Sequence, residues 1–400
     1  MEAYLDHAST SPLRPEALAA MLPYLAEHHG NPSGAHRVAR RARRALDEAR
    51  EQVAACLGCR PGEVVFTATG TEADNLAVLG AAGRVPDAPG RAAALSQGRV
   101  LAGAVEHHAV LRAAASVGAT VVPVDGDGLV DLAALEAALH PGVALVSVMA
   151  ANNEVGAIEP ITAVAERVRA LAPGALVHTD AVAAVPWVDP PALTAAVDLL
   201  SVAAHKFGGP KGAGALVVRD GVSLAPVLHG GGQERDRRPG THDVAAVVGM
   251  AAALHAATTR RDEEADRIGA LRDHLADGLL AAADGVTEHG PARGDPGAPW
   301  RLPTIVNLRF EGVDNEELLL LLDEEGIAAS AGAACASGAA EPSHVLMAMG
   351  LSRDEARSAV RFSLGHSSTV AEVDHVLAVV PKALERLRTW TGGPASAADG

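Results

Sequence analysis

Between about residues 60 and 220, short apolar runs alternate with segments of helical periodicity, which limits the folds open to this chain. The runs that predict strands cover residues 63–67, 99–103, 119–124, 143–148, 175–178, 197–201 and 214–218. They are continuously apolar, as is typical of parallel strands covered on both faces. The pattern therefore predicts an α/β fold with a mainly parallel seven-stranded sheet, whose functional groups lie at the carboxyl ends of the strands.

The chain has 400 residues, which exceeds the size at which a single core keeps growing. After about residue 255 the pattern changes to longer helices, such as 262–282 and 315–324, with fewer strands. Thr369 and Glu372 form the pattern of a capping box for a terminal helix that runs to about Leu387. We therefore predict a second, smaller α+β domain.

The predicted boundaries place the large domain at residues 15–255 and build the small domain from residues 1–14 and 256–391. The last segment, 392–400, consists mainly of Gly, Pro, Ser and Ala, and we expect it to be disordered. The stretch 86–98 is expected to be a surface loop.

The bulk composition excludes several classes of protein. A formal net charge of −16 argues against nucleic acid as a direct partner. No apolar run reaches the ~20 residues of a membrane span, and the N-terminus has neither a basic segment nor an apolar stretch typical of a signal peptide. Three cysteines do not form a disulfide framework, so we expect a reducing, cytoplasmic location.

Lys206 and Asp180 point to a cofactor. Lys206 follows a short apolar strand and precedes a glycine-rich turn, which is typical of a Schiff-base lysine rather than a solvated one. An amine held near apolar surface has a lowered pKa and can attack an aldehyde. Asp180, at the end of the preceding strand, could pair with a pyridinium nitrogen. Together they suggest pyridoxal 5'-phosphate (PLP).

Two strand-to-helix junctions offer groups that suit such a cofactor. Gly70 and Thr71 open a helix whose backbone N–H groups could meet a phosphate, although a simple helix cap explains the same residues. His107 opens another helix, where it could stack on a pyridine ring and move protons. The alternative is a histidine that faces water at the helix start.

Two loops offer further polar groups. Asn152 and Asn153 follow a strand and could bind a ring hydroxyl, or they could simply form a turn. The loop 230–241 is rich in glycine and arginine, which suits an anion site, whereas the alternative is a solvated loop.

Cys335 is the best candidate for a nucleophilic cysteine, because its small neighbours allow access. Cys56 and Cys59 have redox-motif spacing, but they end a long helix outside a βαβ unit, so we interpret them as structural. They also lack the second pair of a zinc site, and we predict no metal centre. Arg361 is predicted at the start of a strand, where it could hold a carboxylate or form a surface ion pair.

In this order the motifs closely resemble the cysteine desulfurases of the NifS/IscS type, within class V of the fold-type I PLP enzymes. The resemblance runs from Tyr4 to about residue 388. The matching residues include Gly30-Asn31-Pro32-Ser33, Asn152-Asn153-Glu154, His205-Lys206, Gly230 to Arg235, Gly240-Thr241, Cys335, Glu341-Pro342-Ser343 and Arg361 to Gly365.

The resemblance implies a role for each matching residue. Lys206 would bind PLP, Asp180 would pair with its ring nitrogen, and Asn153 would contact its ring hydroxyl. His107 would stack on the ring and move protons. Cys335 would take sulfur from L-cysteine as a persulfide, leaving L-alanine. Further contacts with the cofactor are implied for Gly70, Thr71, His205 and Thr241. Contacts with the substrate are implied for Arg361 and Asn31.

The resemblance also implies a homodimer, in which Thr241 reaches the phosphate of the partner subunit, and a separate acceptor protein for the sulfur, in iron–sulfur cluster assembly or tRNA thiolation. Ala183, Ala203 and Ala333 stand where the family usually has polar residues. Ala183 and Ala203 motivate an alternative function as another class-V PLP enzyme, such as a selenocysteine lyase or a C–S lyase. A non-enzymatic binding subunit is a third possibility.

Overall fold

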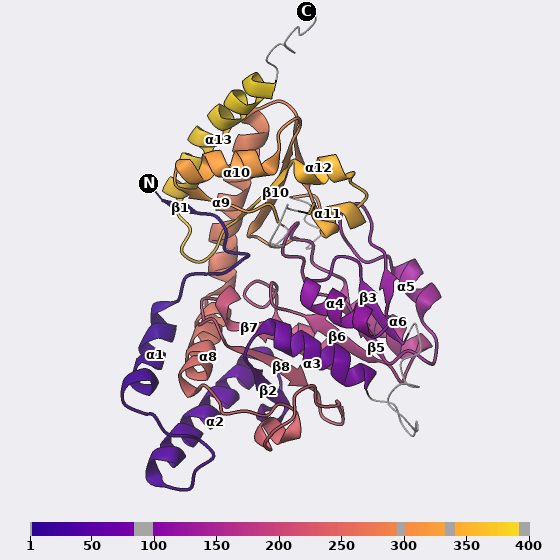
Figure 1. The fold of residues 1–400 in the computed structure, drawn as a ribbon, viewed down its shortest axis with the longest axis vertical. Coiled ribbons are helices and arrows are strands. Elements are labelled where there is room, and N and C mark those ends of the chain that lie inside the picture. Colours follow the sequence, from indigo (N-terminus) through magenta and orange to yellow (C-terminus); the bar gives the residue numbers. More distant parts are fainter. Residues whose placement is uncertain (1, 84–98, 294–300, 333–340, 392–400) are drawn as a thin grey trace, which may run out of the picture.

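The computed structural model describes residues 2–83, 99–293, 301–332 and 341–391. The predicted surface loop 86–98 and the predicted disordered tail 392–400 lie outside these residues. Figure 1 shows the chain in two parts, with a sheet covered by helices in the lower part and a second group of helices and strands above it.

The larger sheet has seven strands and is mainly parallel, as predicted. Their order across the sheet is β2 (Val64–Thr67), β8 (Gly214–Val218), β7 (Leu199–Ala203), β6 (Leu176–Asp180), β5 (Leu145–Ser147), β3 (Val100–Gly103) and β4 (Thr120–Val122). Strand β8 runs antiparallel to both β2 and β7, so β2 has the same direction as β7. The carboxyl ends of β2, β3, β5, β6 and β7 therefore meet at one edge of the sheet.

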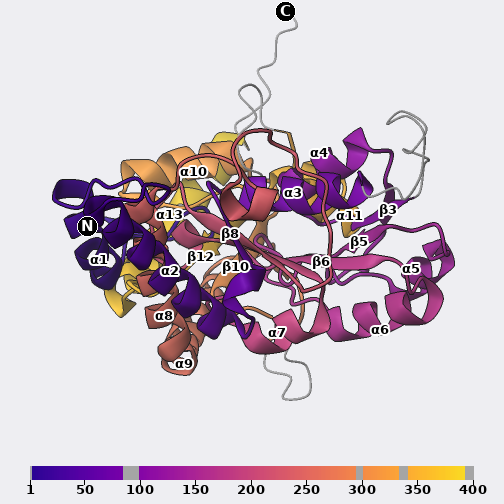
Figure 2. The same cartoon turned by 90° about the horizontal axis from the view of Figure 1, so that it is seen from below.

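Helices cover both faces of this sheet (Figure 2). Helices α3 (Gly70–Ala82) and α4 (His108–Ser116) lie on one face, and α6 (Ile161–Leu171) and α7 (Pro190–Ala196) lie on the other. Almost every residue of the central strands is buried, which explains why their sequences are apolar throughout rather than alternating. Helix α5 (Leu132–Ala138) is capped by Asp131, whose side chain accepts from the Ala133 and Ala134 N–H groups.

The second part is built on a separate antiparallel sheet, in the order β12 (Ala359–Ser363), β10 (Ile305–Phe310) and β9 (Val286–His289). It forms one apolar core with three helices, namely α9 (Arg261–Ala282), α10 (Asn315–Glu324) and α13 (Val370–Thr391). The predicted capping box opens α13: the Thr369 N–H donates to Glu372 Oε2 at 2.8 Å. The first strand, β1 (Ala3–Tyr4), pairs with β11 (Ile327–Ala328), so the second core contains both the first described strand and the last described helix.

The sequence places Arg361 at the start of a strand, and this is wrong. Arg361 is the central residue of β12, which begins at Ala359, because the pairing with β10 extends from Ala359 to Ser363. Because the residues on both sides of Arg361 pair with β10, its side chain is held more firmly than it would be at the end of a strand.

Two long helices and a loop complete the lower part. Helix α2 (Arg37–Leu57) ends at Gly58, whose φ of 68° is the left-handed conformation that glycine accepts readily. Helix α8 (Val244–Thr259) packs against α2 and against α1 (Pro15–Ala26). The loop before α8 contains a short 3₁₀ segment, η4 (Gln233–Asp236). None of the helices in the described ranges is both long enough and apolar enough to cross a bilayer.

Candidate active site

A cavity of about 330 Å³ opens where the carboxyl ends of the parallel strands meet the second part of the chain. We call it the Lys206 cavity. Most of its lining comes from the large sheet and its helices, and the rest comes from the N-terminal segment and from the second part of the chain. The lining residues include Ala8, Ser9, Gly70, Thr71, Asp74, His107, Asn153, Asp180, Ala183, Ala203, His205, Lys206, His344 and Arg361.

Lys206 lies just beyond β7, at the end of a 3₁₀ turn. Its Nζ donates hydrogen bonds to the carbonyl oxygens of Ala8 and of Ser9, the latter at 3.0 Å. Burial, together with the positive charge of Arg361, lowers the pKa of Lys206 to about 8. A substantial fraction of this amine is therefore neutral near physiological pH, as a nucleophilic lysine requires.

Asp180 is the last residue of β6 and is only 4% exposed. One of its oxygens, Oδ1, accepts a hydrogen bond from the Val182 N–H at 2.9 Å. Burial raises the pKa of Asp180 to about 6, although the Val182 hydrogen bond and the charge of Lys206 oppose the shift. A buried carboxylate with one oxygen bound to the backbone can offer the other oxygen to a protonated ring nitrogen.

His107 caps α4, and its Nδ1 accepts a hydrogen bond from the Ala109 N–H at 3.1 Å. Burial and the charge of Lys206 lower the pKa of His107 to about 4, so the ring is neutral at pH 7. With Nδ1 used by the backbone, Nε2 is the nitrogen that carries the proton. A neutral imidazole with a defined tautomer suits both stacking and proton transfer.

The N-terminal turn of α3 borders the cavity with Gly70 and Thr71. A Cβ on Gly70 would lie 2.9 Å from Val182 Cγ2 and 3.1 Å from Ala203 Cβ, so this position requires glycine. Backbone N–H groups at the start of a 13-residue helix attract an anion. His205 borders the same cavity, and its Nδ1 lies 3.2 Å from Thr10 Oγ1.

The two asparagines after β5 have different environments. Asn152 is fully buried, and its side chain binds only the protein: Oδ1 accepts from Glu154 N–H at 2.8 Å, and Nδ2 donates to the Val105 carbonyl at 3.1 Å. Asn153 instead lines the cavity. Only the second asparagine is therefore available to a ligand.

Arg361 reaches the cavity from the small sheet and is 2% exposed. Its Nη2 donates to Asp6 Oδ1 at 2.7 Å and to Ser9 Oγ at 2.9 Å, and its Nη1 donates to the Asn153 carbonyl at 3.0 Å. Among the described residues, its buried Nε has no hydrogen-bond partner. The alternative of a surface ion pair is therefore wrong in one respect, because the pair with Asp6 exists but the guanidinium is buried.

Two predicted residues are not brought into this cavity by the single chain, and a third is not among the described residues. Thr241 borders a separate recess of about 80 Å³ beside Thr67 and Ala213. Asn31 is exposed, and its Oδ1 accepts from the Ser33 N–H at 2.9 Å. Cys335 lies outside the described residues.

Cys56 and Cys59 are free, half-buried thiols at the end of α2. Burial raises the pKa of both, that of Cys59 to about 11, so neither forms a thiolate readily. The structural interpretation of this pair is thus supported. The described ranges also contain no group of three or more His, Cys, Asp or Glu residues placed to hold a metal ion.

The structure adds lining residues to which the sequence assigned no role. Ala8 and Ser9 approach Lys206 across almost 200 positions of sequence, Asp74 projects from α3, and His344 from α11 (His344–Ala348). One local signal existed for Asp74, since it is a charged residue between the apolar Ala73 and Leu76 of α3, whose side chains are buried. The other contacts depend on long-range packing that leaves no mark in the local sequence.

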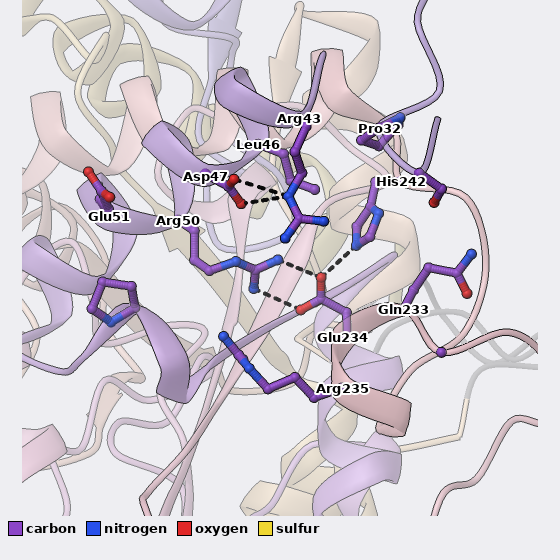
Figure 3. A pocket seen from close by; sticks show the side chains of 13 residues that line it. Pro32, Arg43, Leu46, Asp47, Arg50, Glu51, Gln233, Glu234, Arg235 and His242 are labelled. Atoms are coloured by element: carbon purple, nitrogen blue, oxygen red, sulfur yellow. Dashed lines mark hydrogen bonds and ion pairs between the residues drawn. The ribbon is translucent and has the colours of Figure 1, made fainter. Parts of the chain in front are cut away.

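A second, larger pocket of about 690 Å³ lies between α2 and the η4 loop (Figure 3). We call it the α2 pocket. Arg50 and Glu234 form a two-pronged ion pair across it, with N–O distances of 2.8 and 2.6 Å, and His242 Nε2 also contacts Glu234 Oε1 at 2.5 Å. The arginines of the 230–241 loop contact groups within the chain: Arg238 pairs with Glu72, and Arg235 donates to the Gly62 carbonyl. In the single chain these two guanidinium groups thus have protein partners, and the anion site of this loop stays a prediction.

The residues of the Lys206 cavity fit PLP. They provide a lysine of lowered pKa for its aldehyde, a buried carboxylate for its ring nitrogen, and a glycine-opened helix terminus for its phosphate. Ala203 adds no hydroxyl at the phosphate end and Ala183 no amide beside the ring. Two lost neutral hydrogen bonds cost about 1 kcal/mol each, which does not outweigh a covalent bond and a buried ion pair.

Comparisons with known proteins agree with this geometry. The profile of the family described as "Aminotransferase class-V" matches residues 3–376. The chain therefore belongs to the class-V aminotransferase family, whose members depend on PLP.

Within that family the similar proteins are cysteine desulfurases. The chain is 46% identical to the "IscS-like cysteine desulfurase" of Mycobacterium tuberculosis, over 96% of this chain and 97% of the relative. It is 44% identical to a "Cysteine desulfurase" of Cereibacter sphaeroides, over 96% of both chains. These relatives support a cysteine desulfurase over the alternative of a selenocysteine lyase or C–S lyase.

Solved structures give the same result. A "NifS-like protein" superposes with a TM-score of 0.86 at 34% identity, and covers 96% of this chain and 100% of its own. The structure described as "SspA in complex with cysteine" superposes with a TM-score of 0.75 at 31% identity, over 92% of this chain and 100% of its own. The prediction of a PLP fold type I protein with a large sheet domain and a smaller α+β domain is confirmed.

Proposed function

We propose that this chain converts L-cysteine to L-alanine and carries the released sulfur as a persulfide on Cys335. The observation that carries the proposal is the Lys206 cavity itself, in which a lysine with a pKa of about 8, a buried carboxylate and a buried arginine face one small volume. When bound, PLP supplies an electron sink that stabilises a carbanion next to the amino group.

The residues of the chain then have the following roles. Lys206 binds the cofactor and moves protons, Asp180 holds the ring nitrogen, and His107 stacks on the ring and exchanges protons. The remaining contacts are Asn153 with the ring hydroxyl, Gly70, Thr71 and His205 with the phosphate, and Arg361 with the substrate carboxylate. Arg361 already binds Asp6, so the carboxylate of the substrate would approach its remaining free edge.

The sulfur-transfer step balances without an added oxidant. The Cys335 thiolate attacks the sulfur of the substrate, so that a sulfur–sulfur bond forms and the carbon–sulfur bond breaks. The electron pair stays on the substrate carbon, which takes up a proton to give alanine. Cys335 keeps the sulfur until an acceptor protein removes it, for iron–sulfur cluster assembly or for tRNA thiolation.

The test compares Cys335→Ala with Cys56→Ala and Cys59→Ala, which remove thiols of raised pKa elsewhere in the chain. Wild type and both control variants should form alanine and sulfide from L-cysteine with a reductant, and Cys335→Ala should not. Equal turnover by Cys335→Ala would exclude the persulfide mechanism. Mass spectrometry should find an added 32 Da on the Cys335 peptide only.

A homodimer would explain why Asn31 and Thr241 lie outside the cavity of their own chain, since each could serve the cavity of the partner. The exposed leucines of α1, which are Leu18, Leu22 and Leu25, support an apolar contact between two copies. Mixed dimers provide the test. Subunits with Lys206→Ala and subunits with Asn31→Ala/Thr241→Ala should each be weak alone, but together they should restore one complete cavity.

Two further proposals concern organisation and location. The large domain would comprise residues 15–255, and the small domain residues 1–14 and 256–391; the support is that most apolar core residues around each sheet fall within these bounds, with Leu302 and Ile305 as exceptions. The free thiols of Cys56 and Cys59, three positions apart, support a reducing, cytoplasmic compartment. Limited proteolysis and labelling of thiols in intact cells would test these proposals.

A further inference from the structure

A chain of buried polar side chains crosses the large sheet beneath the Lys206 cavity. His178 on β6 lies between Ser147 on β5 and Ser201 on β7. Its Nδ1 is 2.9 Å from Ser147 Oγ, and its Nε2 is 2.9 Å from Ser201 Oγ. All three residues are 0% exposed. His178 and Asp180 are two residues apart on one strand, so their side chains project from the same face.

Asp74 lies at one end of this chain. It projects from α3, is 1% exposed, and lines the Lys206 cavity. Its Oδ1 lies 3.7 Å from His178 Nε2 and has no hydrogen-bond partner among the described residues. An ionised carboxylate in such a place is costly, because neither water nor a cation compensates its charge.

Burial and the lack of a hydrogen-bond partner for Oδ1 among the described residues favour the protonated, neutral form of Asp74. Burial and the nearby charge of Asp180 raise the pKa of Asp74 well above its ordinary value, while the Ser201 hydroxyl opposes the shift. Burial and the charge of Asp180 also raise the pKa of Glu106, a second buried acid in this region. Asp180 differs from these two acids, because the positive charge of Lys206 and a backbone N–H both favour its ionised form.

The proton on Asp74 fixes the direction of every hydrogen bond in the chain. Burial lowers the pKa of His178 to about 3, so its ring is neutral and carries one N–H. A protonated Asp74 can donate to Ser201 Oγ, Ser201 then donates to His178 Nε2, and His178 Nδ1–H donates to Ser147. An ionised Asp74 would need the opposite direction throughout. The order of donors thus depends on the charge of Asp74.

We propose that Asp74 is a positioning residue that acts as a neutral hydrogen-bond donor, closing the Ser201–His178–Ser147 chain and leaving Asp180 as the single anion opposite the cofactor nitrogen. A second anion beside Asp180 would repel it and share its attraction for the ring proton. The inference rests on the proposed pairing of Asp180 with that nitrogen. It concerns a residue that has no direct role in the reaction.

The experiment compares Asp74→Asn, which keeps a neutral donor of the same shape, with Asp74→Leu, which keeps the shape and removes the donor. The measurements are the dissociation constant of PLP from the apo-protein, the pH midpoint of the absorption band of the bound cofactor, and kcat/KM for L-cysteine. Asp74→Leu should weaken PLP binding about 10- to 100-fold and shift the midpoint. Asp74→Asn should restore both to within about threefold of wild type.

Two results would overturn the inference. A loss in Asp74→Asn as large as that in Asp74→Leu would mean that the negative charge matters, and unchanged binding in Asp74→Leu would mean that no donor is needed. If Asp74→Leu does not fold, Ser201→Ala removes the same hydrogen bond from the other side. Asp180→Asn is measured in parallel: if it leaves PLP affinity and spectrum unchanged, the proposed pairing of Asp180 fails, whatever the Asp74 variants do.

Discussion

The two pockets of this protein differ in how their charged groups are satisfied. In the larger α2 pocket Glu234 contacts Arg50, His242 and the Phe66 N–H, so its charge is matched within the chain. In the smaller Lys206 cavity the lysine, the carboxylate and the histidine have shifted pKa values caused mainly by burial. Pocket volume is therefore a poor guide to a catalytic site. Buried ionisable groups with shifted pKa values are a better guide.

Backbone strain also separates the two regions. Glu234, Arg235 and Asp236 adopt consecutive left-handed φ values of 48°, 56° and 64°, which cost of order 1–3 kcal/mol each in residues other than glycine. The contacts of Glu234 hold this segment in place, so the α2 pocket uses its charges for structure. The Lys206 cavity leaves its charges available to a ligand.

Replacing the lysine should have the largest effect. Lys206→Ala should lower the turnover of L-cysteine by about 10³-fold or more, because it removes both the covalent bond to PLP and a proton-transfer group. The matched control is Lys211→Ala, which alters an exposed lysine five residues further along the chain and should retain full turnover. Turnover by Lys206→Ala similar to wild type would show that the cavity is not the active site.

Breaking the ion pair of the α2 pocket should affect stability instead. Glu234→Ala leaves the Arg50 charge buried without its partner, and it should lower the free energy of unfolding by about 3–5 kcal/mol. Urea denaturation measures the loss, and the absorption band of bound PLP should persist in the folded fraction. Glu51→Ala, at an exposed acid beside the same pocket, should change stability by less than about 0.5 kcal/mol. A loss below about 1 kcal/mol in Glu234→Ala would contradict a structural role.

Capture of PLP by the apo-protein should depend on pH. Only the neutral amine attacks an aldehyde, and the pKa of Lys206 is lowered to about 8. The capture rate is followed by absorbance between pH 6.5 and 9. It should rise about tenfold per pH unit at the acid end of this range and level off above about pH 8. A rate that still rises about tenfold per pH unit at pH 9 would mean that burial does not lower the pKa of this amine from its ordinary 10.5.

The α2 pocket should respond to pH in the acid range. Burial opposes ionisation of Glu234, but His242 and Arg50 lower its pKa to about 2 from an ordinary 4.5. A lowered acid pKa stabilises the fold fully above the unfolded value, and this contribution is lost as pH falls through the folded value. Stability from this group should be constant above about pH 5 and should decline between about pH 4.5 and 2. Glu234→Gln, which does not titrate, should show a shallower decline in the same window.

The smallest effect should come from the rim of the α2 pocket. Arg43 and Asp47 form an ion pair at 3.0 Å, but their side chains are 61% and 48% exposed. Solvent screens such a pair, and Arg43→Ala should cost no more than about 1 kcal/mol. A double-mutant cycle with Asp47→Ala measures the coupling directly. A coupling as large as that between Arg50 and Glu234 would remove the distinction between buried and exposed pairs in this pocket.

The sequence predicted the parts of the site that depend on local pattern. Strands β2 to β8 were predicted from continuous apolar runs, and Asp180 and Lys206 were correctly placed where such runs end. Their convergence follows from the parallel arrangement alone, because parallel strands end at the same edge. The position of Arg361 was wrong by two residues, since pairing with β10 rather than residue type sets the start of β12.

What the sequence by itself determined is therefore the parallel sheet, the lysine and carboxylate at its edge, and the glycine that opens α3. Only the tertiary structure decided that Ala8 and Ser9 lie against Lys206, that Arg361 pairs with Asp6, and that Asp74 lies 3.7 Å from His178. The physical reason is the range of the interactions. Strand and cap patterns arise between neighbours along the chain, whereas a pKa or a hydrogen bond in a buried site is set by groups far apart in sequence.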